Sequence, residues 1–276
     1  MKKLLACLAI VLVAVSITAC GGRDENTVRI GLVGTLHYQW YAIRDMVYES
    51  DGITLEFVFF NDFATPNRAL ADGEIEMNAF QHRMFLNNEM ATHGYELSYV
   101  GVTFVAPLTL WTYHDHVNSV ADLTDGAVVA IPGDPTNVGR SLRLLESAGL
   151  IVLDTPPDAL ATEADIVEFV ADITLRPMDN SLIANILPDV AAGIITNPTA
   201  FIAGLRHEPD SIFVEDIDVT GPQGYNMTNI IAVRTADLEA GGRLAEMFEI
   251  IARAHNSEAV RQVMLDAYQG ALVPVW

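Results

Sequence analysis

A glycine-rich turn and an arginine one helical turn further on form the strongest candidate site in the sequence. The turn runs from Gly133 to Asn137 and joins an apolar run to a helical pattern, which places Asn137 and Arg140 near the start of a helix. Free N–H groups, a positive dipole end and a guanidinium together suit a carboxylate. The alternative is that Asp134 or Thr136 only caps the helix and that Arg140 pairs with an acidic neighbour.

A phosphate-binding loop would also place glycines between a strand and a helix, but the spacing here excludes it. A P-loop has four residues between its glycines and then Lys, whereas five residues separate Gly133 from Gly139 and Arg140 follows. We therefore expect no nucleotide at this turn.

Aromatic side chains cluster near the ends of two apolar runs that precede the Gly133–Asn137 turn in the sequence. Most of them should be core, but Phe63 and Phe80 stand where a strand gives way to a loop, which is where the wall of a cleft would lie. A thioether or a branched side chain would pack well there, since sulfur against a ring edge adds ~0.3 to 1.5 kcal/mol.

The sequence gives little support to metal binding or to catalysis. His114, Asp115 and His116 could ligate zinc, but no third ligand lies nearby, so a solvated loop is the better interpretation. Neither a Gly-x-Ser-x-Gly elbow nor a His-Glu-x-x-His pair occurs. We predict no enzyme activity, no metal and no cofactor.

Strand-like and helix-like patterns alternate along the chain. Such alternation predicts an α/β fold of mostly parallel sheets with helices on both faces, and the length fits two lobes around a shared cleft. We expect strands near 28–33, 55–60, 74–79, 97–113 (two strands broken at Pro107), 127–131, 173–176, 190–195, 212–214 and 229–233, and helices near 38–49, from 66, 81–93, 136–149, 179–187, 198–205, 236–254 and 257–268.

The N-terminus has the pattern of an export signal. Lys2 and Lys3 precede an apolar stretch that ends in Ile17-Thr18-Ala19-Cys20, so residues 1–19 are predicted to be a signal peptide and residues 20–27 a tether. About 14 apolar residues are too few to span a bilayer, which takes ~20. The end of this stretch resembles a bacterial lipobox, which implies that Cys20 carries lipid.

Removal of the leader leaves a strongly acidic chain. Lys2 and Lys3 are two of 15 basic residues, so the remaining 13, all Arg, face 36 Asp and Glu, and the net charge becomes −23. Nucleic acid is excluded as a partner because binding it requires a basic face. Cys7 leaves with the leader, so Cys20 has no partner for a disulfide within the chain.

Three motifs together resemble the NlpA family of methionine-binding lipoproteins of ABC importers. They lie at residues 60–70, 72–82 and 134–142, and the similarity extends from the lipobox to Trp276. The resemblance implies a two-lobed periplasmic-binding-protein fold (type II) that closes on one methionine and delivers it to a permease driven by an ATPase. It divides the chain into lobe I (28–108 plus 228–276) and lobe II (109–227).

The resemblance also implies roles for individual residues. It assigns the ligand carboxylate to Arg140, the polar end of the ligand to Asn137 and Asn229, and the ligand side chain to Phe63, Phe80 and His82. Two residues stand out at the end of the 190–195 run, because Thr196 replaces an Asn that the family uses for the amino group. The next residue, Asn197, could swing in to compensate.

These observations predict a lipid-anchored receptor that binds methionine, as the L or D enantiomer, and that faces the periplasm or the cell exterior. Another apolar amino acid or a methionine-containing dipeptide is the nearest alternative ligand. A surface adhesin or a permease regulator on the same fold is the alternative from a different class of protein.

Overall fold

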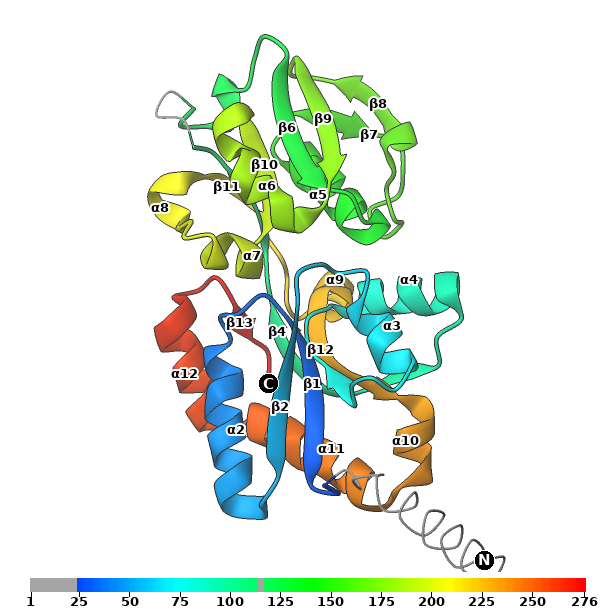
Figure 1. The fold of residues 1–276 in the computed structure, drawn as a ribbon. Coiled ribbons are helices and arrows are strands. Elements are labelled where there is room, and N and C mark those ends of the chain that lie inside the picture. The colour runs from blue at the N-terminus through cyan, green and yellow to red at the C-terminus, as the bar shows by residue number, and fades with distance from the viewer. Residues whose placement is uncertain (1–23, 114–116) are drawn as a thin grey trace, which may run out of the picture.

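The computed structural model describes residues 24–113 and 117–276. These residues form two lobes, one above the other in Figure 1. We call the part built on the six-stranded sheet lobe I, and the part built on the five-stranded sheet lobe II. The predicted signal peptide, Cys20 and the His114–His116 segment lie outside the described residues.

The sheet of lobe I has the order β13-β4-β12-β3-β1-β2. β1 pairs in parallel with β2 and β3, whereas β12 and β13 pair antiparallel with their neighbours. Its strands are β1 (Thr27–Val33), β2 (Thr54–Phe60), β3 (Met77–Asn78), β4 (Leu97–Val105), β12 (Thr228–Arg234) and β13 (Val273–Pro274).

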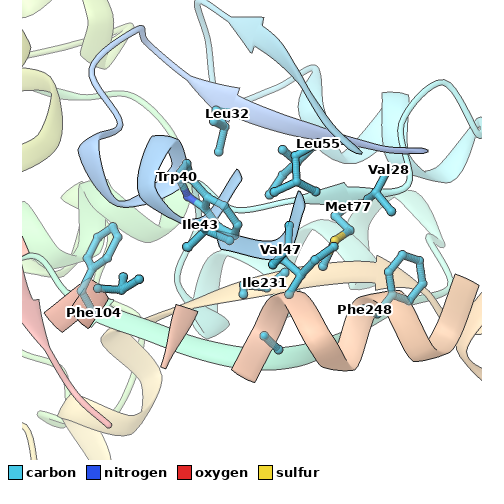
Figure 2. Close-up of a cluster of buried hydrophobic side chains, with 14 of the residues drawn as sticks. Val28, Leu32, Trp40, Ile43, Val47, Leu55, Met77, Phe104, Ile231 and Phe248 are labelled. Carbon is cyan, nitrogen blue, oxygen red and sulfur yellow. The ribbon is translucent and has the colours of Figure 1, made fainter. Parts of the chain in front are cut away.

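Helices cover this sheet and form the larger core. α2 turns Trp40, Ile43 and Val47 inward at helical spacing and ends at Gly52, whose φ of 66° satisfies the left-handed cap. Figure 2 shows these side chains among residues of β1, β2 and Phe248 of α11. The helices of lobe I are α2 (Tyr38–Asp51), α3 (Pro66–Ala71), α4 (Arg83–His93), α9 (Pro222–Met227), α10 (Thr235–Ala240), α11 (Gly242–His255) and α12 (Glu258–Tyr268).

Lobe II repeats the same plan around a second core. Its sheet has the order β11-β5-β10-β6-β9, in which β6 pairs in parallel with β9 and β10, and β5 pairs antiparallel with β10 and β11. Its elements are β5 (Leu108–Trp111), η1 (Val120–Asp122), β6 (Ala127–Pro132), α5 (Pro135–Ser147), β7 (Ile151–Leu153), η2 (Glu163–Asp165), β8 (Ile166–Phe169), β9 (Ile173–Met178), α6 (Asn180–Ile186), η3 (Leu187–Asp189), β10 (Ala192–Thr196), α7 (Asn197–Ile202), α8 (His207–Asp210) and β11 (Ser211–Val214).

The chain passes from one lobe to the other between β4 and β5 and returns between β11 and α9. The lobes also touch away from these crossovers. The rings of Phe201 on α7 and Tyr268 on α12 meet edge to face at 5.3 Å between centroids. This ring contact therefore joins the two lobes at a further place.

The α/β class and the two-lobed architecture that the sequence predicted are confirmed, although several details differ. Both sheets are mixed, because strands next to a crossover run antiparallel to the βα units. The helix expected over 236–254 breaks at Gly241, where φ is 65°. The β7–β8 hairpin was not predicted at all.

Candidate functional site

A cavity of about 440 Å³ lies between the two lobes. Its size falls within the range usual for small-molecule sites. Lobe I supplies the ends of β1 and β2 and the loop before α4, and lobe II supplies the first turns of α5 and α7 and one face of α6. Seven of the eight predicted ligand-binding residues line it, namely Phe63, Phe80, His82, Asn137, Arg140, Thr196 and Asn229.

Aromatic rings form one wall of the cavity. Phe63 and Phe80 lie 6.0 Å apart between ring centroids, and each meets the ring of Phe85 edge to face. Such offset and perpendicular geometries are the favourable ones for aromatic groups. The wall is therefore a rigid apolar surface that suits an uncharged side chain.

His82 joins this wall to the polar side of the cavity. Its Nδ1 accepts the backbone N–H of Phe85 at 3.0 Å, which caps α4 and places the ring proton on Nε2. Nε2 then donates to Asn137 Oδ1 across the lobes at 3.5 Å. Burial, together with the positive charge of Arg140, lowers the pKa of His82 to about 3, so the ring is neutral at physiological pH.

Asn137 is held by the cap of its own helix. The carboxylate of Asp134 accepts the backbone N–H of Asn137 at 3.0 Å and its Nδ2 at 2.9 Å. One amide hydrogen and the amide oxygen of Asn137 are thus directed by protein groups, and α5 begins close to where the sequence predicted.

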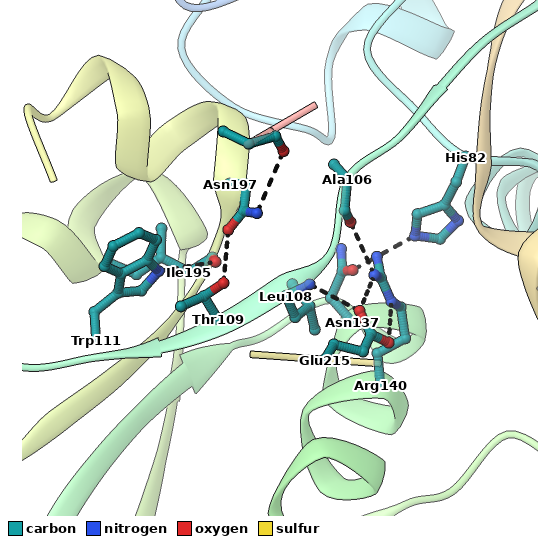
Figure 3. A network of polar contacts seen from close by, with 11 residues as sticks. His82, Ala106, Leu108, Thr109, Trp111, Asn137, Arg140, Ile195, Asn197 and Glu215 are labelled. Carbon is teal, nitrogen blue, oxygen red and sulfur yellow. Dashed lines mark hydrogen bonds and ion pairs between the residues drawn. The ribbon is translucent and has the colours of Figure 1, made fainter. Parts of the chain in front are cut away.

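Arg140 lines the cavity and is paired with an acidic residue of the protein. Its Nη2 lies 2.5 Å from Oε2 of Glu215 and donates to the carbonyl of Ala106 at 3.1 Å, and its Nε lies 3.4 Å from Oε1. Figure 3 shows this pair beside Asn137 and His82. The side chains are only 5% and 8% exposed, which makes this a buried ion pair.

The pairing of Arg140 with an acid was one of the two alternatives that the sequence left open. Glu215 occupies the edge of the guanidinium that is formed by Nε and Nη2. A ligand carboxylate would therefore share this edge with Glu215. Among residues 24–113 and 117–276, Nη1 has no hydrogen-bond partner.

Asn229 is the polar group of lobe I best placed for a ligand. Its backbone forms a bridge with His82, and its side chain is 7% exposed and lines the cavity. In the part of the chain that the structure describes, no hydrogen bond engages its side-chain amide. An amide in this position can both donate and accept.

Thr196 and Asn197 are placed differently from each other. The hydroxyl of Thr196 lines the cavity, but it accepts from Asn180 Nδ2 at 3.1 Å and donates to Thr199 Oγ1 at 3.0 Å. Asn197 does not line the cavity: its amide accepts from Thr109 at 2.9 Å and donates to the carbonyl of Ala271 at 3.3 Å. The structure therefore does not place Asn197 at the cavity, and gives it a contact between the lobes instead.

Sequence reasoning assigned no role to Glu215 or to Asn180. Glu215 lies 75 positions from Arg140, and neither residue carries a local signal of the pairing. The excess of acidic residues made an acidic partner expected without identifying it. None of the residues that line the cavity in the described structure is Asp or Glu.

Two further results concern metals and membranes. Within the described ranges, no group of three or more His, Cys, Asp or Glu could hold a metal ion. No helix in the same ranges is long and apolar enough to cross a bilayer.

Two lobes, two crossovers and an enclosed cavity lined from both sides define a solute-binding protein of the two-lobed kind. The NlpA lipoprotein family model matches residues 28–276, and the chain belongs to that family.

Individual relatives agree with this assignment. The chain is 36% identical over 263 residues to a probable D-methionine-binding lipoprotein MetQ of Vibrio cholerae, covering 94% of this chain and 93% of the relative. It is similar to the substrate-binding protein of a methionine transporter from Streptococcus pneumoniae, with a TM-score of 0.83, 33% identity and coverage of 91% and 96%. A nutrient-binding protein of Burkholderia cenocepacia bound to methionine gives a TM-score of 0.81 at 27% identity, with coverage of 90% and 100%.

Proposed function

We propose that this protein binds methionine between its lobes and delivers it to an ABC importer. The observation that carries the proposal is the buried guanidinium of Arg140 in a cavity between the lobes that also has an aromatic wall. The names of the relatives point to the same ligand.

The polar end of an amino acid matches the free groups of the cavity. The ligand carboxylate would bind Nη1 of Arg140, and the α-ammonium would donate to the amide oxygen of Asn229. Asn137 and His82 bind each other across the cleft and stabilise the closed arrangement around the ligand. The bonds to the ligand carboxylate and to the α-ammonium would be charge-assisted, and such hydrogen bonds are stronger than neutral ones.

The side chain of the ligand would lie against Phe63 and Phe80. A thioether is polarisable and makes favourable contacts with ring edges, which the perpendicular rings of this wall present. Another apolar amino acid or a methionine-containing dipeptide would use the same wall and the same Arg140.

The proposed role in transport implies a membrane anchor, a location and a partner. We propose that Cys20 is the lipid-bearing residue, that the lobes face the periplasm or the cell exterior, and that a permease with its ATPase receives the ligand. An adhesin or a regulator on this fold would not need a saturable ligand.

Mass spectrometry of gently purified protein under native conditions tests the ligand. The proposal predicts a bound mass equal to that of methionine, which is lost on unfolding. The refolded protein should then gain thermal stability with methionine, since a ligand at a hundredfold excess over Kd contributes ~2.7 kcal/mol. A different bound mass would assign another ligand, and no stabilisation by methionine, norleucine or glycyl-methionine would contradict the binding role.

A further inference from the structure

We propose that Glu215 is a specificity-determining residue that makes the cavity select zwitterions over simple carboxylate anions. It would act through Arg140, without touching the ligand, as a fixed negative charge behind the guanidinium. This inference rests on the proposed function, because it takes Arg140 as the partner of the ligand carboxylate.

The position of Glu215 is fixed by the protein on both sides. Its Oε2 accepts the backbone N–H of Leu108 at 2.7 Å, and its own N–H donates to the carbonyl of Leu108 at 2.9 Å. Leu108 lies on one crossover between the lobes and Glu215 follows β11 on the other. A carboxylate held in this way does not swing aside when a ligand enters the cavity.

The charges near the cavity then determine which ligands are accepted. The pair of Arg140 and Glu215 is neutral as a whole, His82 is uncharged, and none of the described residues that line the cavity is acidic. A ligand carboxylate at Arg140 places two carboxylates around one guanidinium. The α-ammonium of an amino acid compensates the extra charge, whereas a simple carboxylate leaves a buried negative charge uncompensated.

The probes are methionine and 4-(methylthio)butanoic acid, which has the same carbon and sulfur skeleton without the amino group. Calorimetry with wild type should show strong preference for methionine. In Glu215→Gln, which keeps a hydrogen-bonding group of the same size, the ratio of the two dissociation constants should shift toward the anion by at least about tenfold, because one unit charge near the site is removed.

Glu76→Gln is the matched control. Glu76 also accepts a fork from an arginine, with Arg29 Nε at 3.1 Å and Nη2 at 2.9 Å, and a backbone N–H at 2.8 Å, but neither residue lines the cavity. The Glu76→Gln protein should lose stability without any change in the ratio of the two dissociation constants. Glu215→Asp retains the charge and should retain the ratio within about threefold even where both affinities fall.

The outcomes separate this inference from the proposed function. No binding of methionine by wild type would overturn both. Binding of methionine by wild type with the anion bound within about threefold would overturn the inference alone. So would an unchanged ratio in a folded Glu215→Gln protein, including one in which both probes bind more tightly by the same factor, which would show that Glu215 merely competes for the fork. If Glu215→Gln does not fold, a ratio in Glu215→Asp that shifts toward the anion by about tenfold would overturn the inference, because that variant keeps the charge.

Discussion

Arg140 pairs with Glu215 of the protein, and we propose the carboxylate of the ligand as its second electrostatic partner. Glu215 orients the guanidinium and compensates its charge, because an unpaired buried arginine would be costly. The same pairing restricts how a ligand carboxylate can approach. At the scale of single residues, we therefore expect binding to depend on a group that the sequence identifies and on another that only the fold brings near it.

Replacing Arg140 by Ala should weaken ligand binding strongly. We expect methionine to bind more weakly by ~2 to 5 kcal/mol, because the ligand carboxylate loses its charged partner in a closed cavity. The melting temperature should also fall, since Glu215 would remain buried without a counter-charge. Arg143→Ala is the control, because Arg143 lies on the same helix but bonds to Glu146 and to the carbonyl of Thr155 outside the cavity. A loss below threefold in calorimetry for Arg140→Ala would contradict its role.

Two buried histidines predict how stability depends on pH. Burial lowers the pKa of His82 to about 3 and that of His255 to about 4. Below the unfolded pKa of about 6.5 the unfolded chain takes up protons that the folded protein does not, so stability falls with pH by up to ~1.4 kcal/mol per unit for each residue. His255→Gln should reduce this slope by that amount between pH 6 and 5 in urea unfolding. An identical slope in the variant would show that His255 is already protonated in the folded state.

The residue types of the site were largely predictable, and their pairings were not. The turn before α5 identified Asn137 and Arg140, because strand, cap and helix lie in one short segment. The resemblance pointed to Asn229 and Phe63 at the cavity, but the contacts of Asn197 and Glu215 depend on how β5, β11 and the C-terminal segment are placed. No local pattern records that placement.

At the scale of elements, the approach of β1 to α7 sets one side of the cavity. Gly34 ends β1 with φ of 78°, and a Cβ there would lie 2.5 Å from Cδ1 of Ile202 on α7. Both residues line the cavity. The left-handed φ favours glycine at this position, and an added Cβ would require Cδ1 of Ile202 to move.

Gly34→Ala should therefore displace the side chain of Ile202 at the cavity wall and weaken methionine binding by about threefold, in addition to the ~1 kcal/mol or more that a left-handed Ala costs. Gly126→Ala is the matched control, because Gly126 also has φ of 78° but no heavy atom lies within 4 Å of its added Cβ. It should lose similar stability in thermal unfolding and keep its affinity. Equal affinities for the two variants would contradict the role of this contact.

The elements themselves followed from periodicity to different extents. Long amphipathic helices and buried strands were predicted near their observed positions, because burial imposes one period along each element. The β7–β8 hairpin was missed because Val152, Val167 and Phe169 are exposed and give no alternation to detect. The antiparallel strands were missed because strand direction depends on where the chain crosses between lobes.

At the scale of the whole molecule, the lobes and the predicted anchor are separate parts of the chain. The predicted tether comes before the body of β1 in the sequence, and none of its described residues, 24–27, lines the cavity. Cys20→Ala should release the protein from membranes in fractionation without a change in methionine affinity, since two acyl chains at ~0.8 kcal/mol per CH₂ supply stable anchoring. If the Cys20→Ala protein still pellets with membranes after its signal peptide has been removed, lipid anchoring is contradicted.

The most direct test of methionine binding in this cavity is a calorimetric titration of refolded, ligand-free wild type with L-methionine and then with D-methionine. We expect saturable binding of one methionine per chain for at least one enantiomer, and much weaker binding in Arg140→Ala. Absence of binding heat for both enantiomers, with no change in melting temperature, would contradict methionine as the ligand of this cavity.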